Sequence, residues 1–140
     1  MAEVKLCIGT KDGKAIQKTI TEQQSKSFIG MNIGEDIKGE IFDAAGYEFT
    51  ITGGSDYCGF PMRSGILGVR KRITILRSIG FRGLEKGIKK RKTVCGHKVT
   101  DSIVQINLKV TKEGSKPLGE LLGIQEKPKE AKDSKEGKKE

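Results

Sequence analysis

The sequence has no tryptophan and few of the residues on which most active sites and metal centres depend. It contains three cysteines and one histidine in 140 residues, and aromatic residues make up 5% of the chain. No stretch approaches the roughly 18 consecutive apolar residues of a membrane-spanning helix. These shortages exclude a disulfide-rich scaffold and predict free thiols in a reducing compartment. They leave a modest hydrophobic core, suited to one compact domain.

The scattered cysteines and the single histidine do not form a metal-binding motif. Cys95 and His97 are two positions apart, but Cys7 and Cys58 are distant, and the sequence has no Cys-x-x-Cys pair. General acid–base chemistry would need carboxylates near the basic region, where Glu85 stands alone. We therefore expect no metal, no cofactor and no catalytic residue. The charged stretch MAEVKLCIGTKDG lacks the apolar run of a signal peptide, so we expect a cytoplasmic protein.

Positive charge is concentrated in one segment. The formal net charge is +9, from 27 Lys and Arg and 18 Asp and Glu. Residues 63–98 hold 12 of these basic residues and one acid, so they carry +11 while the remaining chain carries −2. A solvated face normally mixes both signs, and this imbalance predicts a polyanion partner. Because aromatic residues are sparse, phosphate and groove contacts with structured RNA are favoured over base stacking. The residues expected to bind RNA are Arg63, Arg70, Lys71, Arg72, Arg82, Lys89, Lys90, Arg91, Lys92 and Lys98.

Alternating apolar residues predict several short strands. The clearest alternation is in VKLCIGT, in AGYEFTIT and in TDSIVQINLKVTKEG, where Val104, Ile106, Leu108 and Val110 share one face. AIQKTI, KGEIF and RITIL are weaker candidates. A short helix is expected from the N-cap Thr21 to Gly30, and PLGELLGI predicts a short apolar helix or turn.

These elements predict a mainly β fold, a small closed β-barrel of about six strands with one or two short helices and a basic loop. FRGLEKGIKKRKT is assigned to the loop, because the glycines at 83 and 87 weaken any long helix. We expect residues 1–124 to form this domain. Residues 125–140 contain six lysines and five acids, which predicts a disordered charged tail.

The stretch GGSDYCGFPM, residues 53–62, combines three glycines with Asp56 and a Phe-Pro-Met triplet. A phosphate-binding loop of the Walker type would need a Gly-Lys-Ser/Thr ending, which is absent. The simpler interpretation is a tight turn with glycines at positive φ and Asp56 accepting backbone hydrogen bonds. Phe60 and Met62 would then pack into the core, and Pro61 would fix the direction of the chain.

TGGSDYCGFPM closely resembles the signature of the small-subunit ribosomal protein six family of archaea and eukaryotes. KKRKTVCGH is similar to the family's basic run before Val-x-Gly, and VQINLKVTKEG resembles its last barrel strand. The resemblance covers nearly all of residues 1–124. The positions that match the signature are Gly53, Gly54, Asp56, Gly59, Phe60, Pro61 and Met62.

The resemblance implies a structural and assembly protein of the small ribosomal subunit with no catalytic role. Its partners would be small-subunit ribosomal RNA and neighbouring ribosomal proteins, and we expect a monomer away from the ribosome. An alternative from the residues themselves is a small barrel enzyme or module that holds a phosphorylated small molecule with the Gly-rich loop and the basic strip.

Overall fold

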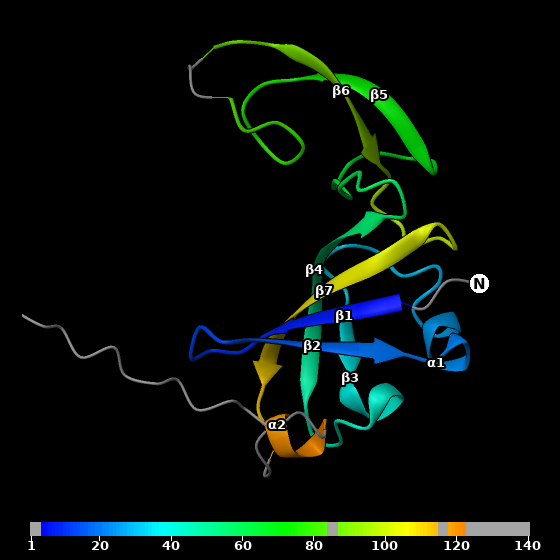
Figure 1. Ribbon diagram of the computed structural model, residues 1–140, viewed down its shortest axis with the longest axis vertical. Coiled ribbons are helices and arrows are strands. Elements are labelled where there is room, and N and C mark those ends of the chain that lie inside the picture. The colour runs from blue at the N-terminus through cyan, green and yellow to red at the C-terminus, as the bar shows by residue number, and fades with distance from the viewer. Residues whose placement is uncertain (1–3, 84–86, 115–117, 123–140) are drawn as a thin grey trace, which may run out of the picture.

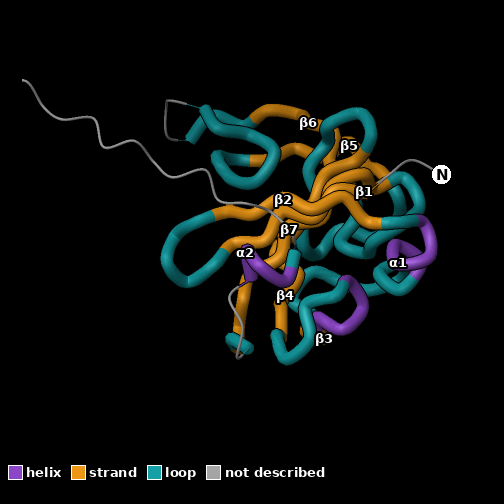
Figure 2. Tube along the Cα trace, turned by 60° about the horizontal axis from the view of Figure 1, so that its bottom comes forward, coloured by secondary structure: helices purple, strands orange, loops and turns teal. Residues whose placement is uncertain are grey.

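Strands dominate the protein, whose computed structural model describes residues 4–83, 87–114 and 118–122 (Figure 1, Figure 2). The predicted tail, residues 125–140, lies outside the described residues, as does the predicted domain boundary at residue 124. No helix in the described part is long and apolar enough to cross a membrane. In chain order, the elements are β1 (Val4–Gly9), β2 (Ala15–Ile20), α1 (Glu22–Lys26), β3 (Asp36–Lys38), the 3₁₀ helix η1 (Gly39–Phe42), β4 (Glu48–Asp56), β5 (Arg70–Ile75), β6 (Lys90–Cys95), β7 (Ile103–Lys112) and α2 (Leu118–Leu121).

The strands form two sheets. Five of them make one sheet in the order β2-β1-β7-β4-β3, and β5 pairs with β6 in a separate two-stranded sheet. All these pairings are antiparallel except that of β1 with β7, which is parallel and sets Lys5 opposite Gln105. Along the long axis of the molecule, β5 and β6 lie at one end and α2 at the other (Figure 1).

The prediction of a mainly β fold with short helices is confirmed, but the closed barrel is not. In the described residues, β2 and β3 are the two edges of the larger sheet, and they do not pair with each other. The described strands number seven, against about six expected. The segments that form β5 and β6 pair with each other and do not extend the larger sheet, so they add nothing to its closure.

The core lies against one face of the larger sheet. Alternation along β1 and β4 buries every second side chain, including Leu6 and Phe49, neither of which is exposed at all. The Phe49 ring lies 5.0 Å from that of Phe42 on η1, which in turn lies 6.2 Å from Phe28, centroid to centroid. These aromatic contacts attach the segments between the strands to the sheet.

The alternation predicted for β7 is correct from Ile106 onward and wrong at its start. Ile103 is 4% exposed, whereas Val104 is only half-buried. The register between β4 and β7 shifts at Ser55 and Asp56, so Asp56 pairs with Ile103. Such an irregularity moves the side chains before it to the opposite face, which a uniform period of two cannot anticipate.

Three local predictions are wrong. The helix α1 begins after Thr21 as expected but ends at Lys26, before Gly30. KGEIF is not a strand, because η1 replaces it from Gly39 onward and ends at Asp43 in the left-handed conformation (φ 65°). The predicted basic loop contains β6, since Lys90–Cys95 is held by hydrogen bonding to β5. Strand pairing here outweighs the low β-propensity of lysine.

Candidate RNA-binding surface

The glycines at the start of the signature stretch belong to a strand and not to a turn. Gly53 and Gly54 lie in β4 and pair with Asn107 and Ile106 of β7. Neither has positive φ, so the prediction of a tight turn is wrong for these two glycines. A Cβ atom at Gly54 would overlap the carbonyl oxygen of Gln105 and lie 3.0 Å from the sulfur of Met62. Gly54 therefore allows a close approach of two segments.

The turn begins at Asp56, two residues after Gly54. Gly59 has φ 79°, and its N–H donates to the carbonyl of Asp56 at 2.8 Å. The Asp56 N–H donates to the carbonyl of Phe60, and the side chain of Asp56 accepts from the Cys58 N–H at 3.3 Å. This last bond confirms the expected role of Asp56. The expected packing is also confirmed, since Met62 is 2% exposed in the core and Phe60 packs against it.

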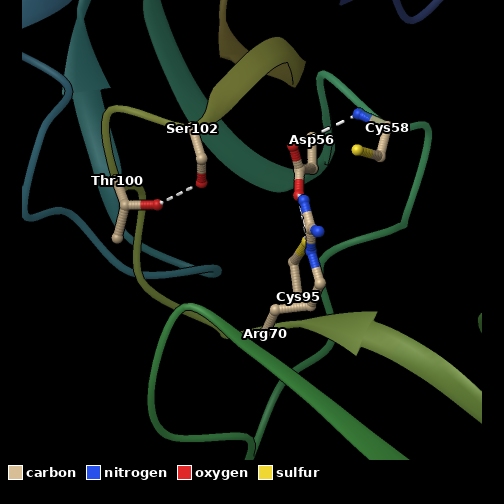
Figure 3. A network of polar contacts seen from close by, with 6 residues as sticks. All are labelled: Asp56, Cys58, Arg70, Cys95, Thr100 and Ser102. Carbon is tan, nitrogen blue, oxygen red and sulfur yellow. Dashed lines mark hydrogen bonds and ion pairs between the residues drawn. The ribbon is translucent and has the colours of Figure 1, made fainter.

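The buried carboxylate of Asp56 joins β4 to β5 and β6 (Figure 3). It accepts hydrogen bonds from Nε of Arg70 at 3.0 Å, from Nη2 of Arg70 and from the thiol of Cys95 at 3.4 Å. Burial alone raises the pKa of Asp56, but the bonds from Arg70, Cys58 and Cys95 outweigh it and hold the pKa below its ordinary value. The folded protein therefore favours the charged form of Asp56.

The hydrogen bonds around Asp56 also change the pKa values of Cys95 and Arg70. Burial, together with the adjacent carboxylate of Asp56, raises the pKa of Cys95 to about 11. This thiol therefore stays neutral at physiological pH and is a poor nucleophile or metal ligand. The hydrogen bonds to Asp56 raise the pKa of Arg70 above its already high value. Arg70 also contacts two aromatic rings, with its guanidinium carbon 5.0 Å from the centre of Phe60 and 5.3 Å from that of Tyr57.

Backbone hydrogen bonds attach β6 to the signature stretch and to the loop before β5. The Cys95 N–H donates to the carbonyl of Pro61, and the Arg63 N–H donates to the carbonyl of Cys95. On the other side, the N–H of His97 and its ring Nδ1 both donate to the carbonyl of Ile66, at 3.0 and 2.7 Å. The single histidine thus holds the loop before β5 in place.

Most of the expected RNA-binding residues lie together on one projecting part of the molecule. We call it the basic arm: β5, β6 and the described residues 76–83 and 87–89 between them (Figure 1). Lys98 is exposed but lies beyond β6, outside the arm. The exposed basic residues of the arm that we expected to bind RNA are Lys71, Arg72, Arg82, Lys89, Lys90, Arg91 and Lys92.

Two of the side chains that were predicted to contact RNA instead bind groups within the protein. Arg70 pairs with Asp56, and its side chain is 31% exposed. Arg63 lies outside the arm and donates to the Ser78 hydroxyl and to the carbonyl of Ile79, so it holds the loop after β5. For Arg70, the sequence held a usable signal, because Asp56 is the one acid just before an otherwise basic segment. For Arg63 we find no such signal.

Sequence reasoning assigned no function to Tyr57, which is 68% exposed and contacts Arg70. An exposed tyrosine next to a guanidinium is a common surface for recognition, and its position inside the signature stretch was the available signal. The four candidate metal ligands do not gather: within the described residues, no group of three or more metal-ligating side chains forms.

Comparison with known proteins decides the family. The family model described as "Ribosomal protein S6e" matches residues 4–123. The chain belongs to this family. A protein named "Small ribosomal subunit protein eS6" from Methanothermobacter thermautotrophicus is 40% identical over 123 residues, covering 87% of this chain and 97% of that protein. Its namesakes from Methanocella arvoryzae and Archaeoglobus fulgidus are 42% and 43% identical, covering 91% and 80% of this chain and 91% and 88% of their own lengths. The similarity to the family thus extends from the signature stretch over residues 4–123.

Proposed function

We propose that this protein is a structural constituent of the small ribosomal subunit and binds ribosomal RNA through the basic arm. The observation that carries the proposal is a row of exposed basic residues without carboxylate partners in the described part of the chain, which belongs to the S6e family. Lys71, Arg72, Arg91 and Lys92 form no ion pair with any described residue. The relatives are named as small ribosomal subunit proteins, and this family identity supports a role without catalysis.

The energetic basis is the release of counterions. Adjacent positive charges repel one another when no acid neutralises them, and a polyanion backbone removes that repulsion. Each neutralised phosphate also frees condensed cations, so affinity falls steeply with salt. Lys89, Arg82 and Lys98 are exposed and would add to the contact. Arg70 and Arg63 would position the arm from within.

We also propose that residues 1–124 are the RNA-binding unit and that the protein is a monomer away from the ribosome. Residues 125–140 carry a net charge of only +1, so they add little to a phosphate contact. Neighbouring ribosomal proteins would meet the parts of the surface that RNA leaves free.

Co-sedimentation is the direct test. The protein should migrate with small ribosomal subunits in a density gradient and remain bound at moderate salt. A protein found only in the ribosome-free fractions would overturn the proposal. Saturable one-to-one binding of a nucleotide in a thermal-shift panel would support a small-molecule site in its place.

A further inference from the structure

The register of the basic arm sorts its arginines and lysines onto opposite faces. Side chains alternate along a strand, and residues directly opposite each other on paired strands share a face. Arg72 pairs with Thr93, and Thr74 pairs with Arg91. These four make one face, which we call the arginine face.

The intervening pairs make the other face. Lys71 pairs with Val94, Ile73 with Lys92, and Ile75 with Lys90. We call Lys71, Lys90 and Lys92 with these apolar partners the lysine face. In sequence, the basic residues of β6 form one run with no visible division. Only the pairing with β5 shows that neighbours in that run point in opposite directions.

Contacts along the arm show that the two faces are distinct surfaces. On the arginine side, Arg70 and Cys95 form the pair nearest the body, and both contact Asp56. On the lysine side, Ile75 and Val94 are buried, and a Cβ atom at Gly80 would lie 3.5 and 3.0 Å from them. The loop after β5 therefore covers part of the lysine face, and the body anchors the base of the arginine face.

Beyond these contacts, both faces present exposed basic side chains that form no ion pair with the described part of the chain. Arg72 and Arg91 are exposed on one face, and Lys71 and Lys92 on the other. Lys90 is partly engaged, with its ammonium 5.6 Å from the centre of the Phe81 ring. A ribbon that lay against RNA with one face only would leave the charges of its second face unneutralised.

Resting on the proposed function, we propose that the basic arm inserts between two segments of ribosomal RNA and bridges them. The arginine face contacts one segment and the lysine face the other. Charge complementarity favours RNA backbone on both sides, because each face offers, on two adjacent strands, two cations that form no ion pair with a described residue. The guanidinium groups, with Thr74 and Thr93 beside them, suit bidentate phosphate contacts, whereas the lysines act as point charges.

The test compares two double variants that remove equal charge from the same two strands. Arg72→Ala with Arg91→Ala alters the arginine face, and Lys71→Ala with Lys92→Ala alters the lysine face. Small subunits are reconstituted with full-length protein, and hydroxyl-radical footprinting maps the protected ribosomal RNA. The wild-type protein should protect two segments, and each double variant should lose protection of a different one.

Filter binding to the same RNA gives a second readout. Each double variant should make the log–log salt slope shallower by about 1.8, and the combined quadruple variant by about 3.6, taking 0.9 per phosphate as for duplex DNA. Circular dichroism checks that the variants fold, and Gln replaces Ala at these positions if either variant does not.

Two results would overturn the bridge. Loss of the same RNA segment in both variants would mean a single contact surface. No change in footprint or slope for one variant would mean that its face meets solvent or an acidic protein. Failure of the proposed function looks different, because the wild-type protein would then neither co-sediment nor protect any RNA.

Discussion

At the scale of single residues, the carboxylate of Asp56 connects parts of the protein that are distant in sequence. Its side chain is fully buried, and its donors lie in β5, in β6 and in the turn after β4. A buried carboxylate is tolerated only while such donors satisfy it. The orientation of the basic arm thus depends on a residue that touches no RNA in our proposal.

Arg70→Ala should destabilise the protein, because it leaves this carboxylate with only the Cys58 N–H and the Cys95 thiol. The expected loss is about 1–3 kcal/mol of unfolding free energy, measured by urea denaturation. Arg72→Ala is the matched control, since Arg72 lies on the same strand and face but forms no ion pair with any residue that the structure describes. Its stability should change by less than about 0.5 kcal/mol. Equal losses in the two variants would contradict the assignment.

Acid should abolish the advantage of the native Asp56 over Asp56→Asn. The pKa of Asp56 lies below its ordinary value of 3.8 in the folded protein. Its contribution is therefore fully present above that value and is lost as the pH falls through the lower folded pKa. The wild type should be more stable at about pH 7, and the difference should narrow below about pH 4. A constant difference down to about pH 3 would show that the carboxylate is not the cause.

Two neighbouring glycines of the signature should differ sharply in tolerance. Gly54→Ala forces a Cβ against the Gln105 carbonyl and the Met62 sulfur, and should cost about 1–3 kcal/mol. A Cβ at Gly53 meets nothing within 4 Å, so Gly53→Ala should leave thermal stability almost unchanged. Similar melting temperatures for the two variants would refute the close approach at Gly54.

At the scale of elements, the basic arm has its own small hydrophobic cluster. Ile75 and Val94 are buried but lie outside the main core cluster. They pack beside the loop that contains Gly80, while the main core packs against the five-stranded sheet. The arm should therefore open locally without unfolding the rest.

Ile75→Val should loosen the arm alone. Removing one buried methylene costs about 0.5–1.5 kcal/mol, and here the loss should appear as faster hydrogen exchange at β5 and β6 amides. Ile106→Val, in the centre of the main core at 1% exposure, should instead accelerate exchange across the whole five-stranded sheet. Global acceleration by both variants would show that the arm and sheet unfold together.

The alternation of apolar residues is sufficient to predict strands that bury one face against the core. It does not predict a strand that is held mainly by pairing with its neighbour. The alternation around Phe49 and Ile106 located β4 and β7, because their apolar face meets the core. β6 was missed, since Lys90, Arg91 and Lys92 carry no apolar alternation and are ordered by β5. Alternation does not predict the contact of Asp56 with Arg70, which lies 14 residues further along the chain. The only signal for it in the sequence is the position of Asp56 as the one acid just before the basic segment.

At the scale of the whole molecule, charge and fold are separable. The segment 73–92 holds seven basic residues and one acid. Its net charge of +6 is two-thirds of the protein's net charge of +9. Its removal would leave every strand of the five-stranded sheet intact. Stability and RNA affinity should therefore respond to different parts of the chain.

Replacing residues 73–92 by Asn-Gly tests this separation. Arg72 and Thr93 are directly paired, so a two-residue turn can join them. The shortened protein should keep its far-ultraviolet circular dichroism and a cooperative thermal transition but lose most RNA binding in filter assays. Retention of full affinity at moderate salt would place the RNA contact on the five-stranded sheet.

The parallel contact between β1 and β7 has a consequence for the order of folding. Lys5 pairs with Gln105 and Ile8 with Leu108, so the centre of the sheet is closed by residues about one hundred positions apart. During synthesis, β1 has only β2 paired beside it until β7 emerges, so its other edge stays unpaired for that time. Contacts this remote raise the contact order and slow folding. Nascent chains of this protein should therefore present an open strand edge on β1, the kind of surface that chaperones bind, until β7 has been synthesised.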